Sequence, residues 1–350
     1  MNTQPQPQDE PTLQVRIRAA DGLLAVVPYL LGFHPANSLV VLAVSRPGGR
    51  IRLVFRFDLP DPPDPGLTAE ITGHAASLLT RNQCTDAVVI GYGPGILVTP
   101  LADRARQVLP AAGITLHDVL RVHEGRYWSY PCGDPSCCPP AGHPVPASTH
   151  PAAVTLAEAG NTAAVSRAAL AATIAPLTGS DAVMTGATRQ VEHDAVRLAA
   201  TRPRALLTKG LAAVKGAITA YRGGGALTEP GEFAALAVAL TSLRIRDDAW
   251  ARMDPDHTAA HFRLWTDLVR RARPGYAAAP ASLLAFTAWQ AGDGALGNLA
   301  LDRALADQPG YSMALLLRDA LAACLPPQAA RLPMTPEEVA ASYDHLDPTY

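Results

Sequence analysis

The feature that most constrains the fold is a change of hydrophobic period shortly after residue 147. Before it, short apolar or alternating runs typical of strands take turns with runs of helical spacing. Residues 50–59 show the alternation most plainly, because their odd-numbered positions are apolar and their even-numbered positions are mostly charged. From about Thr149 onward only helical spacing is found. The pattern predicts two domains of different class.

The first part is predicted to be an α/β domain with a mixed, partly parallel sheet, because its strands alternate with helices. Residues 38–45 and 50–59 are joined by a short glycine turn and are expected to pair as an antiparallel hairpin. Two further strands are expected at 86–92 and 114–122, and a cysteine-rich loop ends the domain.

The second part is predicted to be all-α. The expected boundaries are a disordered tail at 1–12, the α/β domain at 13–147, the helical domain at 148–327 and a C-terminal tail at 328–350. In this tail Thr335, Pro336 and Glu338 predict a short helix, with Thr335 as its N-cap, Pro336 at its first position and Glu338 completing a capping box.

Composition narrows the classes of function. The formal net charge is −2 over 350 residues, which provides no strong field for a polyanion, so nucleic acid is not expected as a partner. The most apolar window, residues 23–44, is interrupted by Pro28, Gly32 and His34 and is not expected to cross a membrane. The N-terminus lacks a basic and apolar leader, and the cysteines are odd in number. A cytoplasmic location is therefore predicted.

Three stretches carry a resemblance to a known family. They are VPYLLGFHPANS at 27–38, RYWSYPCGDPSCCPP at 126–140, and the segment from Gly292 to Ser312 that contains GDGAL and PGYS. Together they resemble the actinobacterial domain-of-unknown-function family 4192 over roughly residues 13–327. The resemblance implies a bacterial, cytoplasmic protein and no established activity. Asn37 and His143 depart from the family pattern, in which an aspartate and a small hydroxyl residue are usual.

The densest group of potential metal ligands is Cys132, Cys137, Cys138 and His143. Three thiolates and one imidazole would complete the tetrahedral set of a structural zinc. The spacing differs from paired C-x2-C knuckles, so two other interpretations stay open. The cysteines could pack as small apolar side chains in a proline-bounded turn, or act as a regulatory thiol or disulfide. The structural turn is the favoured interpretation, and zinc is kept as an alternative.

Arg126, Trp128 and Tyr130 alternate onto one face of the strand that precedes this loop. An arginine beside two aromatic rings could stack a planar ligand. Large aromatic side chains more often bury their area against a neighbouring layer, so packing is the favoured interpretation and ligand binding the alternative.

His34, Asp58 and Arg56 are the candidates for a catalytic group. His34 could serve as a base, and Asp58 could orient it if strand pairing brings the two together. The competing interpretation is that Gly32 and Pro35 shape a turn in which His34 bonds to local backbone. This second interpretation is favoured.

The C-terminal segment favours a protein partner. Small residues at helical spacing between Trp289 and Leu305, followed by Pro309, are similar to one tetratricopeptide-type helix pair. Such pairs bind other proteins on concave surfaces. The leading hypothesis is therefore a non-catalytic interaction or regulatory protein that uses its C-terminal helices. The alternatives are an enzyme with its site near His34, Asp58 and the 128–138 loop, and a small-molecule or metal sensor.

Overall fold

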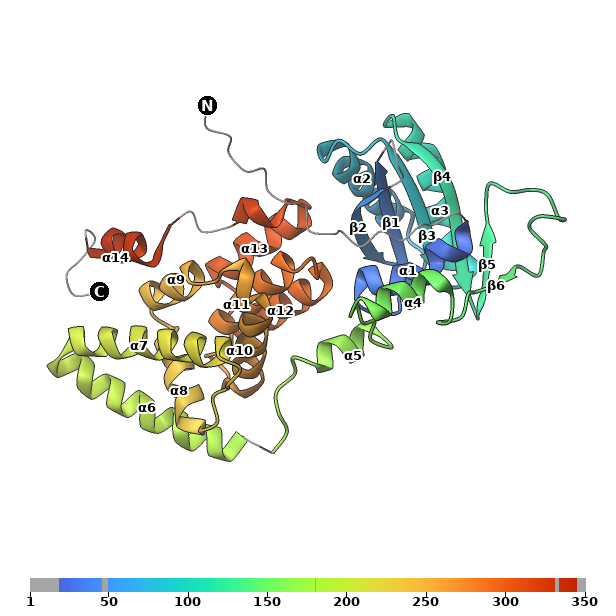
Figure 1. Cartoon of the computed structure of the whole chain (residues 1–350). Coiled ribbons are helices and arrows are strands. Elements are labelled where there is room, and N and C mark those ends of the chain that lie inside the picture. Colours follow the sequence, from blue (N-terminus) through green and yellow to red (C-terminus); the bar gives the residue numbers. More distant parts are fainter. Residues whose placement is uncertain (1–18, 46–49, 180, 331–333, 345–350) are drawn as a thin grey trace, which may run out of the picture. The chain divides into compact units, whose positions relative to one another are not determined.

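A computed structural model describes residues 19–45, 50–179, 181–330 and 334–344 (Figure 1). The predicted disordered tail at 1–12 lies outside these residues. The chain forms two compact units, Met1–Arg167 and Ala168–Tyr350. The boundary expected after Ala147 falls inside the first unit, because helix α4 (Pro151–Glu158) packs on helix α1 (Ala20–Leu31).

The first unit is built on a six-stranded sheet in the order β2-β1-β3-β4-β5-β6. Its strands are listed here in chain order: β1 Ser38–Ser45, β2 Arg50–Asp58, β3 Asp86–Tyr92, β4 Thr115–His123, β5 Arg126–Ser129 and β6 His143–Pro144. The β1–β2 hairpin is antiparallel, as predicted, and β3–β4 is the parallel pair. The remaining neighbours are antiparallel. The prediction of a mixed, partly parallel sheet is confirmed.

Helices α2 (Pro65–Arg81) and α3 (Gly95–Ala111) cover one face of this sheet. Alternation along β1 and β3 turns Leu39, Val41 and Val89 toward them, and these side chains are fully buried in one apolar cluster with both helices. Helix α3 serves as the crossover between the parallel strands β3 and β4, which is the usual connection for such a pair.

The other face of the same strands is also closed to water. Val40, Leu42 and Ile90 point to this side and have no exposed surface. The α1 and α4 helices, which pack on each other, belong to this side of the unit (Figure 1). Strands buried on both faces read as continuous apolar runs, which explains the sequence SLVVLAVS of β1.

The second unit is helical throughout its described residues. Its helices are listed in chain order: α6 Asp181–Thr201, α7 Pro203–Arg222, α8 Pro230–Ala239, α9 Leu243–Ala251, η1 Pro255–His257, α10 Thr258–Arg271, α11 Ala278–Gln290, α12 Gly294–Asp307, α13 Ser312–Ala322, η2 Pro327–Ala330 and α14 Pro336–Asp344. The short α5 (Arg167–Ala172) begins at the division between the units. No strand follows β6 in the part of the chain that the structure describes, so the predicted change from mixed sheet to helix is confirmed.

Helix α11 is the centre of the second unit. Every residue from Ala278 to Trp289 is buried, and the helix packs on α10, α12 and α13. A helix that is apolar on all sides is stable in water only when other helices surround it. The α11–α12 pair coincides with the predicted tetratricopeptide-like pair, but α11 leaves no open face, and the likeness to that repeat stays a prediction.

The predicted C-terminal helix is present as α14. The Thr335 hydroxyl accepts the Glu338 backbone N–H at 3.2 Å, and the Glu338 carboxylate accepts the Thr335 N–H at 2.8 Å, which is the expected capping box. The helix packs on α9, where the Tyr343 hydroxyl donates to Asp247 at 2.6 Å. Among the residues with described positions, no helix has both the length and the apolar character needed to cross a bilayer.

Candidate thiol and metal site

The cysteine loop starts and ends at the same edge of the sheet. Strand β5 pairs with β4 and then with β6, and residues 130–142 connect β5 to β6. Because Tyr127 is paired with His143, the two ends of the loop are neighbours across a β-ladder. The fold therefore holds both stems of the loop in place while its middle extends into solvent.

The stem is held by Arg126, Trp128 and Tyr130, for which packing is the favoured interpretation and binding of a planar ligand the alternative. The Trp128 indole Nε1 donates to the Pro140 carbonyl at 3.0 Å, and the Arg126 guanidinium donates to the Gly142 carbonyl at 3.0 Å. The Tyr130 hydroxyl is 2.7 Å from the Thr99 hydroxyl of α3, and its ring packs on the apolar cluster. These contacts support the packing interpretation for all three residues, and ligand binding by them stays a prediction.

The Trp128 indole also packs against an arginine of the neighbouring strand β4. The Arg121 guanidinium lies 3.9 Å from the Trp128 ring centroid, from the neighbouring position on β4. Sequence reasoning missed Arg121 as part of the loop's support. The available signal was the predicted strand at 114–122, but only the strand register shows that Arg121 is opposite Trp128.

Inside the loop, Asp134 organises a tight turn. Its carboxylate accepts the Ser136 backbone N–H and hydroxyl, both at 2.8 Å, and its carbonyl accepts the backbone N–H of Cys137 at 3.2 Å and of Cys138 at 2.6 Å. Asp-Pro is a common way to begin such a turn. The hydrogen bonds to its own loop also lower the pKa of Asp134 below its usual value. The turn folds Cys137 and Cys138 back toward Cys132.

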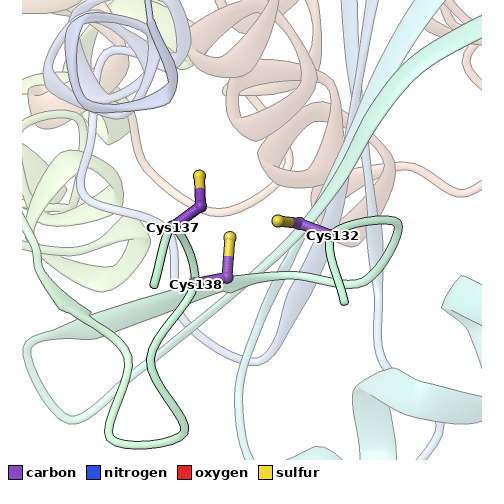
Figure 2. A group of neighbouring side chains, drawn as sticks. All are labelled: Cys132, Cys137 and Cys138. Carbon is purple, nitrogen blue, oxygen red and sulfur yellow. The ribbon is translucent and has the colours of Figure 1, made fainter. Parts of the chain in front are cut away.

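The three sulfur atoms meet at the open side of this turn. All the Sγ atoms of Cys132, Cys137 and Cys138 lie within 4.8 Å of one another, and Figure 2 shows the three side chains around one space. Cys137 is exposed and the other two are half-buried. The chain's five cysteines are all free thiols in this structure, so no disulfide holds the group together.

The close approach of the sulfurs shifts the pKa values of Cys132 and Cys138 in opposite directions. The Cys138 thiol donates a hydrogen bond that stabilises the Cys132 thiolate, and the Asp134 backbone N–H adds a second, so the pKa of Cys132 is lowered. The same interaction with Cys132 raises the pKa of Cys138 to about 12. The first proton therefore leaves from Cys132, and a thiolate is the form that binds metals.

His143, the possible fourth ligand in the zinc alternative, is not part of this group. Its Nε2 lies 2.7 Å from the Cys137 carbonyl oxygen, and its ring stacks on Tyr127 with 5.1 Å between centroids. The imidazole therefore links the Cys137 backbone to strand β6 at the base of the loop. The structure brings together the three predicted thiol ligands and places the histidine elsewhere.

The donor set fits a soft, small cation. Tetrahedral zinc with bonds of about 2.3 Å to sulfur needs sulfurs about 3.8 Å apart, so the observed spacing requires a contraction of about 1 Å or less. Adjacent cysteines would point to opposite sides in a strand. Here the turn at Asp134 brings both to one side. Three thiolates leave one tetrahedral position open.

The second predicted group, around His34, is arranged differently. The Arg56 Nε donates to the Ser38 hydroxyl at 2.7 Å, Arg56 also pairs with Asp58 two residues away, and its guanidinium lies 5.9 Å from the Phe33 ring centroid. The His34 side chain is exposed and makes no hydrogen bond or ion pair with the residues that have described positions, while its backbone N–H donates to Ala164 at 2.9 Å. Arg56 and Asp58 are brought together, and His34 is not joined to them.

A family model described as a domain of unknown function, DUF4192, matches residues 21–328. No curated protein and no solved structure gives a match. The match covers most of both compact units, including the thiol loop, and the chain belongs to the DUF4192 family.

Proposed function

We propose that this protein is a non-catalytic regulatory protein that binds one soft metal ion, with zinc the best fit, through Cys132, Cys137 and Cys138. The observation that carries the proposal is the convergence of three sulfur atoms within 4.8 Å on a loop that faces solvent. Thiolate ligands favour zinc and cuprous ions over magnesium or calcium, which prefer oxygen. An odd number of cysteines, five, suits a reducing compartment, so the proposal places the protein in the cytoplasm.

The three-thiol site lies on an exposed loop, which suits an ion that exchanges with the solution. Its fourth position is open to water or to a thiol from solution. An exposed site of this kind gains and loses its ion more readily than a buried tetracysteine site, as a sensor requires.

Metal content of untagged protein tests the proposal directly. After incubation with zinc and removal of the excess, we expect one zinc per chain, and cobalt substitution should give the intense near-ultraviolet band of thiolate-to-cobalt charge transfer. Replacing Cys132, Cys137 or Cys138 by serine should weaken binding at least about tenfold, because each removes a ligand. Cys324→Ser serves as the matched control and should bind as the wild type does.

His143→Ala separates two versions of the site. If the three thiols bind the ion alone, His143→Ala keeps the stoichiometry of one and the cobalt spectrum. If His143 completes the site after the loop rearranges, that variant loses the tetrahedral cobalt spectrum. Wild-type protein that retains no stoichiometric zinc or cobalt would contradict the proposal.

A second function, protein binding by the helical unit, is favoured by one surface feature. Leu315 and Leu316 on α13 are 43% and 67% exposed, and Leu325 just beyond the helix is 43% exposed. Exposed leucines that gather on one element are typical of contact surfaces. A partner that co-purifies with the wild type and is lost with Leu315→Ser/Leu316→Ser would support this function. Equal recovery with both proteins would contradict it.

A further inference from the structure

We propose that Cys132 and Cys138 form a reversible disulfide within the loop when a hydroperoxide oxidises the metal-free protein, and that this bond prevents metal binding. The formation of the disulfide stands on the loop geometry alone. The effect on metal binding rests on the function proposed above.

The loop places the two sulfurs ready to react. They lie within 4.8 Å of each other without any bond between them, and Figure 2 shows the Cys132 side chain directed across the loop toward Cys138. A disulfide requires about 2.05 Å between the sulfurs, so the loop must contract by less than about 3 Å. Gly133 gives room for this movement, because it is exposed and no atom lies within 4 Å of the position its Cβ would take.

The alternative pairings are less favourable. A disulfide normally joins residues whose Cα atoms are about 4.4–6.8 Å apart, whereas adjacent Cα atoms are only about 3.8 Å apart. A bond between Cys137 and Cys138 would therefore be strained. Cys137 is also tied by its carbonyl to His143 at 2.7 Å, which opposes its movement toward Cys132. Cys84 is buried in the sheet's apolar cluster, so its thiol is shielded from solvent and from a dissolved oxidant.

The chemistry balances with a hydroperoxide as the oxidant. One sulfur of the pair, as a thiolate, attacks the peroxide oxygen; the O–O bond breaks, hydroxide or alkoxide leaves, and a sulfenic acid forms. The second sulfur, as a thiolate, attacks the sulfenic sulfur; the S–S bond forms and hydroxide leaves. The two thiol protons neutralise the two leaving oxyanions. With hydrogen peroxide, two thiols and one peroxide give one disulfide and two waters.

The disulfide would act on the metal site by removing its ligands. A sulfur held in a disulfide has no thiolate charge to offer a metal ion. Oxidation of Cys132 and Cys138 leaves Cys137 as the single thiol of the group. A bound metal ion would in turn occupy both sulfurs and slow their oxidation, so the two states exclude each other.

Peptide mapping of metal-free, full-length protein tests the disulfide. After one equivalent of hydrogen peroxide and alkylation of the remaining thiols, we expect the number of free thiols to fall from five to three. Cleavage before aspartate separates Cys132 from a peptide that begins at Asp134 and carries Cys137 and Cys138. A disulfide that links these two peptides, in monomeric protein, is the expected product.

Single serine variants identify the partners. Cys137→Ser and Cys324→Ser should still lose two thiols, whereas Cys132→Ser and Cys138→Ser should not form the bond. Oxidation of the wild type to a sulfinic acid without a disulfide, a bond between two chains, or a Cys132–Cys137 bond would each overturn the assignment. Reduction by dithiothreitol should restore all five thiols.

Zinc-loaded protein tests the link between the two states. One equivalent of peroxide should oxidise the loaded protein at least about tenfold more slowly than the metal-free protein, and disulfide formation should release zinc to a chromogenic chelator. Oxidised protein that keeps its full zinc would overturn the link. If wild-type protein binds no zinc but forms the disulfide, the metal function fails while the disulfide stands.

Discussion

The Trp128 indole lies so close to the backbone of Gly142 that a Cβ at position 142 would be 2.5 Å from Cε2 of the ring. Gly142 also has a φ of +72°, a left-handed conformation that residues with a Cβ rarely adopt. Its carbonyl accepts the Arg126 guanidinium, so one buried glycine joins the two sides of the loop stem. We therefore expect the arrangement of the three thiols to depend on this contact at the base of their loop.

Gly142→Ala should therefore disturb both stability and the thiol group. The added methyl must displace the indole, which breaks the hydrogen bond to Pro140, and the positive φ adds strain; we expect a loss of about 1–3 kcal/mol. Urea unfolding measures the loss, and zinc titration measures the loop. Gly133→Ala in the same loop is the control for the urea measurement, because the added Cβ meets no neighbouring atom and the residue has no positive φ. Equal behaviour of the two variants would show that the Trp128 contact contributes nothing.

Gly91→Ala should destabilise the first unit because β3 and α3 touch there. A Cβ at position 91 would be 2.2 Å from the nearest methyl of Val98. Forcing a methyl into this space should cost about 1–3 kcal/mol. Val98→Ala removes the obstructing methyls, so in the double variant we expect less destabilisation than the sum of the single changes. Additive losses in thermal unfolding would contradict a direct contact.

His261 should make the helical unit less stable in acid. The residue is 2% exposed, and burial together with the nearby Arg222 lowers its pKa from 6.5 to about 4. Between pH 6.5 and pH 4 the unfolded chain therefore binds more protons than the folded one, and the free energy of unfolding falls as pH falls, by up to about 3 kcal/mol. His261→Gln should flatten this part of the urea stability–pH curve. His257→Gln, at a half-exposed position, should leave it steep.

Asp307 should be essential for the start of the central helix. Its carboxylate accepts the backbone N–H groups of Gly275, Ala277 and Ala278 at 2.6, 2.9 and 3.0 Å, where α11 begins. Asp307→Ala leaves these donors without their acceptor and should cost about 1–3 kcal/mol. Thermal unfolding compares it with Asp319→Ala at an exposed position on α13. A similar midpoint for both variants would contradict the capping role.

Much of the fold could be predicted from the sequence because its signals are local. Alternation at 50–59 predicted the β1–β2 hairpin, and Thr335 with Glu338 predicted the cap of α14, since each pattern involves residues only a few positions apart. The change to helical spacing after Thr149 likewise anticipated a second unit without strands. The family motif in the loop identified the three cysteines but did not show how they are arranged.

Contacts between side chains of different helices, strands and loops needed the folded chain. No local pattern indicates that Gly91 meets Val98, that Asp307 caps a helix beginning 29 residues earlier, or that Arg121 supports Trp128. The same holds for His143, a candidate metal ligand in the alternative interpretation, whose ring stacks on Tyr127 and whose Nε2 bonds to the Cys137 carbonyl instead. Side-chain type and spacing determine which groups a chain can offer. Strand register and the path of the backbone determine which of those groups meet, because spacing along the chain fixes neither the pairing of strands nor the direction of a side chain in a turn.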